Sequence, residues 1–265
     1  MRSQSWALTL FAVGVFMAAL DNGIISAALT TLIYDFGVTA NWGAWAVTIY
    51  TLGLAVSIPI VGKLSDKFGR KRLFLIEIFL FGLGSLLVAI SSSFEMLLIS
   101  RAIQSLGGGG LFIIASSHVL STFPQESQGK ALGMLGGMNG IGAVLGPNVG
   151  SFILDMTGGQ WEWLFLINLP IAVVVLAAGW KLIAESRAEQ AGRLDVVGAG
   201  LLAVAILSFM YGITNITGVN LLESLLDSTV YPYLAGGILL FGALLLYETR
   251  LMRRKGDPVL DRKSV

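Results

Sequence analysis

The segment GKLSDKFGRKR, residues 62–72, is a short basic loop with an apolar run on each side. The runs at 43–62 and 73–92 are each about 20 residues long, which is the length a helix needs to cross the hydrocarbon core of a bilayer. Similar runs lie at 6–34, 96–122, 130–154, 162–183, 195–217 and 229–251. The sequence therefore predicts an all-α, polytopic membrane protein with about eight spans.

The composition supports this prediction and excludes several classes of protein. Hydrophobic residues fill 55% and charged residues 12% of the 265 positions, unlike a soluble domain of this length. Because the chain has no Cys and one His, disulfides, thiolate metal sites and Cys nucleophiles are excluded. No cluster of His, Asp or Glu has metal-ligand spacing, so we predict no enzyme activity, no metal and no cofactor.

The charges between the apolar runs predict the orientation in the membrane. If the amino terminus is cytoplasmic, the basic residues outside the spans all fall on the cytoplasmic side: Arg2, Lys63, Lys67, Arg70, Lys71, Arg72, Lys130, Lys181, Arg187, Arg193 and those in 250–263. The opposite loops carry acidic residues and no Lys or Arg: Asp35, Glu95, Asp155, Glu162, Glu223 and Asp227. The positive-inside rule then predicts a multi-pass protein of the inner or plasma membrane with both termini cytoplasmic. A net charge of +1 does not suggest a nucleic-acid partner.

Loop lengths predict the domain organisation. Short loops join the first six spans, so residues 1–183 are expected to form one compact bundle. Residues 184–251 are expected to hold a polar cytoplasmic connection, ESRAEQAGRLD at 185–195, followed by two more spans. In the basic cytoplasmic tail, 252–265, Pro258 and Leu260 begin a new apolar pattern, after which we expect a second bundle.

The basic loop at 62–72 resembles the signature loop of the major facilitator superfamily, usually written G-x-L-a-D-r-x-G-R-[KR]-x. The matching residues are Gly62, Leu64, Asp66, Gly69, Arg70 and Lys71. In that family the loop latches the two halves of the transporter in the outward-facing state. The resemblance therefore implies a conformational role for Asp66 and Arg70, rather than a role in substrate binding.

Four further segments resemble the same family. LISRAIQSLGGGG (98–110) is similar to the fourth-helix motif R-x-x-Q-G, with Arg101 and Gln104 in place and Ser105 where Gly is usual. GMNGIGAVLGPNVG (137–150) is similar to the fifth-helix motif of antiporters, and its residues are Gly137, Gly142, Gly146, Pro147 and Gly150. LDNGIISAAL (20–29) and WEWLFLINLP (161–170) resemble the first and sixth helices of the fourteen-helix drug:proton antiporters.

The resemblance implies a specific architecture over essentially the whole chain. The chain would hold the first six-helix bundle and the two linker helices of a fourteen-helix antiporter. The second bundle would be absent from it and would be supplied in cis or by a partner chain, because alternating access needs two units about a shared site.

Asp21 stands about halfway along the first span, where a carboxylate costs roughly 2.5 to 3.5 kcal/mol. It is expected to face a cavity or a partner, and either to exchange protons or to make a packing hydrogen bond. Arg101 is the obvious partner, together with Gln104 one turn along. However, Asp21 lies about 18 Å and Arg101 about 9 Å from the outer end of its span, so Arg101 could instead extend to the outer interface.

Several other residues allow two interpretations. Glycines four residues apart in the fifth span, with Pro147 to kink the helix, fit either static close packing or a moving helix contact. For Glu77 the sequence favours snorkelling or loop pairing over a proton relay, and for His118 it favours packing over metal binding. Gly107 to Gly110 lacks the GK[ST] of a phosphate loop, which favours helix flexibility and close packing.

These observations lead to a functional hypothesis with open alternatives. The resemblance implies proton-driven export of amphipathic, often cationic compounds such as drugs, dyes or biocides. Its partners would be membrane lipid, protons and a small-molecule substrate held near the bilayer midplane. The alternatives are a specific metabolite or siderophore exporter on the same scaffold, and a non-transporting half that needs a second bundle.

Overall fold

The computed structural model describes residues 2–187, 195–216 and 221–253, which are almost entirely helical. The chain forms two compact units, Met1–Ala188 and Glu189–Val265. Each unit is described by itself below. Most of the predicted basic tail, 254–265, and part of the predicted connection, 188–194, lie outside the described residues.

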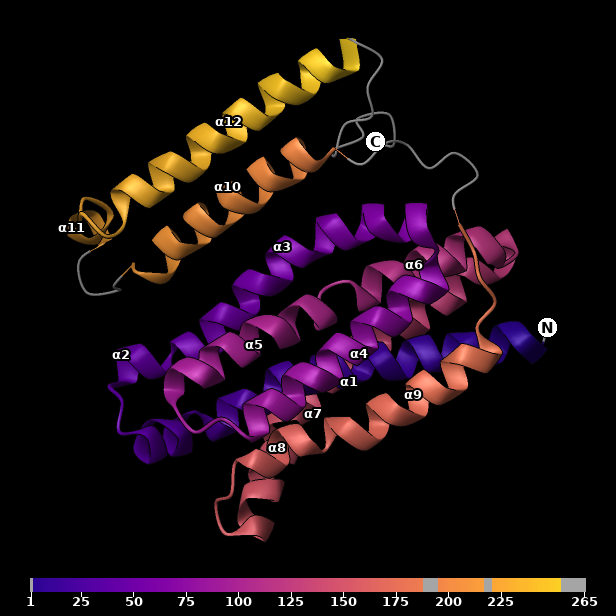
Figure 1. Cartoon of the computed structure of the whole chain (residues 1–265), viewed down its shortest axis with the longest axis horizontal. Coiled ribbons are helices and arrows are strands. Elements are labelled where there is room, and N and C mark those ends of the chain that lie inside the picture. Colours follow the sequence, from indigo (N-terminus) through magenta and orange to yellow (C-terminus); the bar gives the residue numbers. More distant parts are fainter. Residues whose placement is uncertain (1, 188–194, 217–220, 254–265) are drawn as a thin grey trace. The chain divides into compact units, whose positions relative to one another are not determined.

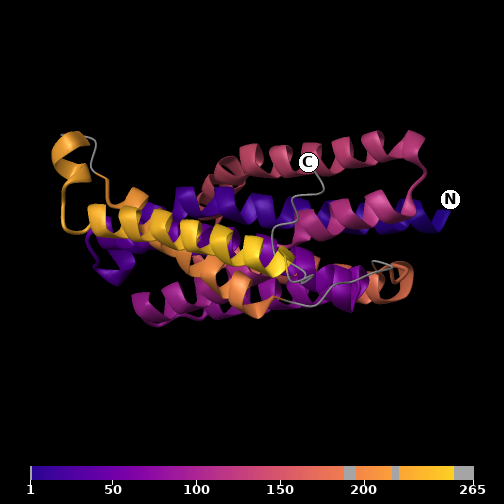
Figure 2. The same cartoon turned by 90° about the horizontal axis from the view of Figure 1, so that it is seen from above.

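The first unit is a bundle of helices that run alongside one another (Figure 1). Its helices are α1 (Arg2–Phe36), α2 (Ala40–Gly43), α3 (Trp45–Phe68), α4 (Arg70–Ala89), α5 (Phe94–Gly108), α6 (Leu111–Thr122), α7 (Gln125–Thr157), α8 (Glu162–Leu166) and α9 (Asn168–Leu182). Helix α7 packs along α1, as Figure 2 shows, while α4 packs on α5 and α9.

The described helices include 7 that are long and apolar enough to cross a membrane. They are Ser5–Phe36, Ala40–Phe68, Arg70–Ala89, Phe94–Thr122, Glu162–Leu182, Val197–Thr214 and Tyr231–Leu251. The eighth predicted run lies in α7, whose 33 residues give a length of about 50 Å at 1.5 Å per residue. Helix α7 is long enough to span a bilayer, but its many glycines add length without adding hydropathy.

The structure divides two of the predicted spans, 96–122 and 162–183, into two helices each, and a short helix precedes a third, 43–62. Helices α2 and α3 meet at Ala44, α5 and α6 meet at Gly109 and Gly110, and α8 and α9 meet at Ile167. Span-length apolar runs alone do not reveal these divisions, although the glycines at 107–110 favoured helix flexibility at the second one. The α5–α6 break matters most for the sites below, since side chains from neighbouring helices hold it.

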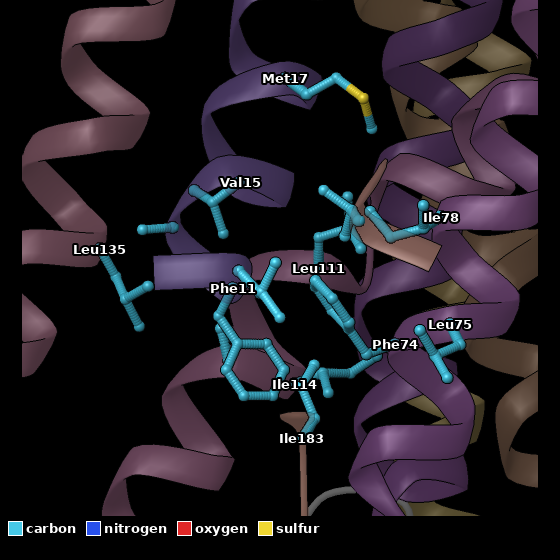
Figure 3. Packing of buried hydrophobic residues seen from close by; sticks show 14 of the residues in the cluster. Phe11, Val15, Met17, Phe74, Leu75, Ile78, Leu111, Ile114, Leu135 and Ile183 are labelled. Atoms are coloured by element: carbon cyan, nitrogen blue, oxygen red, sulfur yellow. The ribbon is translucent and has the colours of Figure 1, made fainter. Parts of the chain in front are cut away.

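Two apolar clusters fill the first unit, and α1 contributes to both. One cluster surrounds Phe11 and Phe74, whose ring centroids are 4.5 Å apart in an edge-to-face arrangement (Figure 3). The other includes Leu20, Ile24 and Phe165. Along α1 the contacts change from the first cluster to the second just where Asp21 stands.

The second unit pairs α10 (Val196–Thr214) with α12 (Tyr231–Arg253), and the short α11 (Leu221–Leu225) lies between them in the chain. Close packing is possible because the backbone at Gly237 lies against Phe209, where an added Cβ would come within 2.7 Å. The Ser208 hydroxyl donates to the Tyr233 carbonyl at 2.8 Å. This unit is therefore a hairpin of two span-length helices.

Candidate functional site

A cluster of polar side chains lies in the apolar interior of the first unit, and all its members are fully buried. They come from four helices: Asp21 from α1, Ser85 from α4, Arg101 and Gln104 from α5, and Asn168 from α9. Buried polar groups in a membrane protein are costly and mark functional positions by default. We call these five residues the central cluster.

The Asp21 carboxylate is the common acceptor of the central cluster. Its Oδ2 accepts from Arg101 Nη1 at 2.8 Å in a fully buried ion pair. Its Oδ1 accepts from Gln104 Nε2 at 2.9 Å and from Asn168 Nδ2 at 2.7 Å. Of the two sequence-based alternatives for Arg101, the structure shows contact with Asp21 and not extension to the interface.

Arg101 is held by more than its ion pair. Its Nη1 also donates to Gln104 Oε1 at 2.7 Å, and its Nε donates to the Ala46 carbonyl at 3.2 Å. The guanidinium carbon lies 4.1 Å from the centroid of the Tyr50 ring and 5.7 Å from that of Phe165. Aromatic faces stabilise a desolvated cation, so the pocket replaces part of the water that Arg101 loses on burial.

The sequence did not identify two members of the central cluster. Ser85 Oγ accepts from Gln104 Nε2 at 2.8 Å and from Asn168 Nδ2 at 3.3 Å, which ties α4 to α5 and α9. Asn168 could have been found, since it is a lone amide within an otherwise apolar run. Ser85 carried no such signal, because serine is common in membrane helices and can bond its own backbone.

The Asp21 carboxylate and the Arg101 guanidinium balance each other's charge inside the bundle. A charged pair buried this completely is stable only while both partners remain, since either charge alone is costly to bury. Arg101 Nη2, Asn168 Oδ1 and the Tyr50 hydroxyl have no hydrogen-bond partner within the described residues. The central cluster and the neighbouring Tyr50 therefore keep polar atoms that a further ligand could bond. Within the described part of the chain, no three His, Asp or Glu side chains come close enough together to hold a metal ion.

The signature loop, residues 62–72, is helical in the structure except at Gly69, with 62–68 in α3 and 70–72 in α4. It forms a second polar cluster at the end of α4 opposite Ser85. Arg70 pairs with Asp66 at 2.8 Å, donates to the Ser121 hydroxyl at 2.6 Å, and donates its backbone N–H to the Ser186 carbonyl at 2.9 Å. Gly69 has φ 104° and lies against Glu185, so a side chain there would be both strained and obstructed. The loop is thus fastened to α6 and to the segment after α9.

Lys71 and Glu185 strengthen this attachment. The Lys71 N–H donates to Glu185 Oε1 at 3.0 Å, and Lys71 Nζ donates to the Trp180 carbonyl at 2.6 Å. His118, buried in α6, places its Nδ1 2.9 Å from the Ser186 hydroxyl and packs on the ring of Phe11. The polar stretch that the sequence suggested as a connection therefore begins as part of this cluster. Gly62 lies near α6, where an added Cβ would be 3.4 Å from the Ile113 side chain.

The glycines of α7 fall into two groups. Gly142, Gly146 and Gly150 face α1, and an added Cβ at Gly146 would come within 2.5 Å of the Cα of Gly23. Pro147 also lies against Gly23, and α7 continues through Pro147 as one helix. Gly137 faces open space within this unit, with nothing within 4 Å of an added Cβ, and four other glycines of α7 share this property: Gly129, Gly133, Gly136 and Gly140.

Comparison with known proteins places the chain among transporters. The family model described as Major Facilitator Superfamily matches residues 11–257. Over 259 residues the chain is 63% identical to YfiU, an uncharacterized MFS-type transporter of Bacillus subtilis (strain 168), covering 98% of this chain and 50% of that protein.

Two further relatives have more specific names. Multidrug resistance protein 3 of the same Bacillus subtilis strain is 38% identical over 200 residues, which are 76% of this chain and 38% of that protein. The riboflavin transporter RibZ of Clostridioides difficile (strain 630) is 34% identical over 202 residues, or 76% of this chain and 44% of that protein. The chain spans half or less of the length of these relatives.

Solved structures agree on the fold. The inward-open xylose transporter XylE from E. coli superposes with a TM-score of 0.60 at 17% identity, covering 88% of this chain and 63% of that one. A bacterial homolog of the human lysosomal transporter Spinster gives a TM-score of 0.60 at 16% identity, covering 88% and 59%. The predicted all-α transporter fold and family resemblance are confirmed.

Proposed function

The chain belongs to the Major Facilitator Superfamily, and we propose that it is the amino-terminal part of a proton-coupled exporter of amphipathic organic compounds such as drugs, dyes or biocides. The similarity to Multidrug resistance protein 3 supports this class of substrate. The observation that carries the proposal is the central cluster. In it, a buried carboxylate and a buried guanidinium form an ion pair that one proton can break.

The ion pair supplies a mechanism for coupling. When Asp21 is ionised, its charge is balanced by Arg101 and by two amide donors. When a proton binds Asp21, the guanidinium loses its counter-charge and must find another acceptor. A cationic substrate near ionised Asp21 would compete with both Arg101 and the proton, so that substrate and proton bind alternately.

The substrate cavity requires a second wall. We propose that it forms near the bilayer midplane between this bundle and a second bundle, supplied in cis or by a partner chain. Tyr50 and Phe165, already stacked on Arg101, would give this bundle's side of the cavity an aromatic character that suits cationic amphiphiles.

The remaining sites are proposed to govern conformation. The signature loop, through Gly62, Asp66, Gly69, Arg70 and Lys71, would latch the two halves in the outward-facing state. Gly142, Gly146, Pro147 and Gly150 would let α7 move against α1 without steric obstruction, because backbone meets backbone there. Gly137 would face the second bundle. The basic loops favour placement in the inner or plasma membrane with both termini cytoplasmic.

A second candidate function is export of one specific metabolite on the same scaffold. The similarity to the riboflavin transporter RibZ favours it. Both candidates use the central cluster in the same way and differ only in the substrate that the completed cavity accepts. A panel of cationic dyes and neutral metabolites in the transport experiment below would separate the two candidates.

The proposal is tested by Asp21→Asn in the complete transporter, reconstituted in vesicles with an imposed pH gradient and the cationic dye ethidium. Asparagine has nearly the shape of aspartate but is neutral and cannot exchange a proton. Because it leaves Arg101 without its counter-charge, folding of the variant is checked first. We expect gradient-driven efflux to be lost at matched expression, and Asp21→Glu to keep part of it. Unchanged pH-dependent efflux in Asp21→Asn would remove Asp21 from the mechanism.

A further inference from the structure

The break between α5 and α6 is held by side chains from two other helices. In a continuous helix the Gly110 N–H would donate to the Leu106 carbonyl, four residues earlier. Here the Gly110 N–H donates to Glu77 Oε2 on α4 at 2.8 Å. The Leu106 carbonyl instead accepts from the Ser57 hydroxyl on α3 at 3.1 Å. The Gly110 N–H and the Leu106 carbonyl, which would bond to each other in a continuous helix, are therefore both satisfied by side chains, as lipid requires.

The glycine run at the break lets the neighbouring helices reach it. An added Cβ at Gly107 would lie 2.2 Å from the Phe81 nitrogen on α4, and one at Gly110 would lie 2.7 Å from Glu77 Oε2. An added Cβ at Gly109 would lie 2.7 Å from the Ser57 Cβ. The run is thus a contact surface for two helices.

Glu77 is a buried carboxyl group without a cationic partner. Its exposed fraction is 3%, and none of the ion pairs among the described residues includes it. The sequence-based expectation of snorkelling or loop pairing does not fit, since the side chain turns inward to a backbone N–H. In its ionised form this carboxylate is balanced by the N-terminus of α6 and by one hydrogen bond.

The helices packed against α4 carry other charged or titratable groups, and those nearest in the spans already have partners. Arg101 on α5 is paired with Asp21, and His118 on α6 contacts Ser186. The remaining groups lie toward the helix ends: Lys63, Asp66 and Lys67 on α3, Glu95 on α5, Glu162 on α8 and Lys181 on α9. One further group lies close to the break, the Tyr50 hydroxyl of α3.

Tyr50 links the break to the central cluster. Its ring stacks on Arg101, while its hydroxyl lies 2.8 Å from the position of an added Cβ at Gly108. The side chain is fully buried and the hydroxyl has no partner within the described residues. One end of Tyr50 thus contacts the proposed coupling pair, and the other lies at the glycine run that Glu77 holds.

We propose that Glu77 is a second proton-binding residue of the transporter and that its charge state controls the break between α5 and α6. This inference rests on the proposed proton-coupled export. One proton from water adds to a Glu77 carboxylate oxygen and later returns to water, and no other bond changes. The ionised form holds Gly110 by a charge-assisted hydrogen bond, and the neutral form holds it less strongly.

A weaker hold on Gly110 frees the N-terminus of α6 to rejoin α5, with its N–H donating to Leu106. Because Arg101 lies on α5, this change would shift Arg101 relative to Asp21. Proton binding at Glu77 would therefore alter the central cluster through the backbone, with Tyr50 packed between the two sites.

The test is infrared difference spectroscopy on the purified complete transporter in lipid vesicles, with pH stepped across its functional range. The readout is the C=O stretch of a protonated carboxylic acid. We expect Glu77→Gln to remove one component of this band that Asp21→Asn leaves in place. Glutamine still accepts from the Gly110 N–H, so the variant should fold. Glu248→Gln removes an equally buried carboxyl from the other unit and should keep the component.

A transport measurement on the same samples separates this inference from the proposed function. We expect Glu77→Gln to lose gradient-driven ethidium efflux and to keep ethidium counter-exchange, in which no net proton moves. A spectrum unchanged by Glu77→Gln would overturn the assignment of Glu77, even if the wild type pumps. Absence of gradient-driven efflux in the wild type would overturn the proposed function, while the spectrum still decides whether Glu77 binds a proton.

Discussion

The two carboxyl groups buried in the spans of the first unit have very different surroundings. Asp21 has a guanidinium and two amide donors, whereas Glu77 has one backbone N–H at a helix N-terminus. The removal of a charged partner from a buried pair is much more costly than the loss of one hydrogen bond. Asp21 is therefore linked to a competing cation, and Glu77 to the backbone conformation of a neighbouring helix.

The largest expected effect is on the Asp21 side of this comparison. Arg101→Ala leaves the Asp21 carboxylate buried without a counter-charge, which we expect to lower the free energy of unfolding by about 3–5 kcal/mol. The melting temperature of the purified protein in detergent measures this loss. Adding Asp21→Asn to the Arg101→Ala variant should recover part of it. If the double variant is no more stable than the single one, the ion pair is not the dominant interaction.

A smaller effect is expected at the α5–α6 break. Ser57→Ala removes the hydroxyl that donates to the Leu106 carbonyl and leaves that carbonyl without its partner. We expect a loss of about 1–3 kcal/mol in the same melting measurement. Ser116→Ala is a matched control on α6, because the Ser116 hydroxyl has no partner in the described part of the chain. Equal losses in the two variants would mean that Ser57 does not hold the break.

The smallest effect concerns an exposed carboxyl group outside the spans. The Thr229 hydroxyl and N–H donate to Asp227 at 2.6 and 2.7 Å, which lowers the pKa of that carboxyl. Thr229→Ala should raise the pKa toward its ordinary value, and an NMR titration of the Asp227 carboxyl would show it. Because the pKa is lowered on folding, this stabilisation is present above the ordinary pKa and is lost as the pH falls through the folded value.

Ser228→Ala serves as the control for this titration, because both groups that donate to the Asp227 carboxylate belong to Thr229 and not to Ser228. The Asp227 pKa should stay lowered in that variant. An equal rise in both variants would assign the effect to the turn as a whole.

The features of the fold that depend on local composition were predicted well from the sequence. The apolar runs located the spans, and the cost of burying Asp21 and Arg101 in lipid marked both as residues that need partners. The α7 run was the exception in hydropathy, since glycine contributes helix length and close contact rather than apolar character. Its two glycine groups look alike in sequence, and only packing distinguishes Gly146, which meets Gly23, from Gly137, which faces open space.

Residues whose role depends on a distant partner were not predictable. Ser85 and Asn168 join the central cluster because α4 and α9 come together, and Glu77 turns inward because α6 begins beside it. Loop and span boundaries carry no information about which side chain faces which, since a rotation of one helix by one residue changes every such contact.

The amino-acid sequence by itself determined the membrane fold, the family, and the two charged residues that need partners in the spans, Asp21 and Arg101. Each of these depends on local composition or on a fixed spacing of residues. The pairing of Asp21 with Arg101, the hold of Glu77 on Gly110 and the attachment of the signature loop to Glu185 depend on contacts between helices far apart in the chain. Such contacts form only when helices pack, since close packing selects which buried polar groups meet.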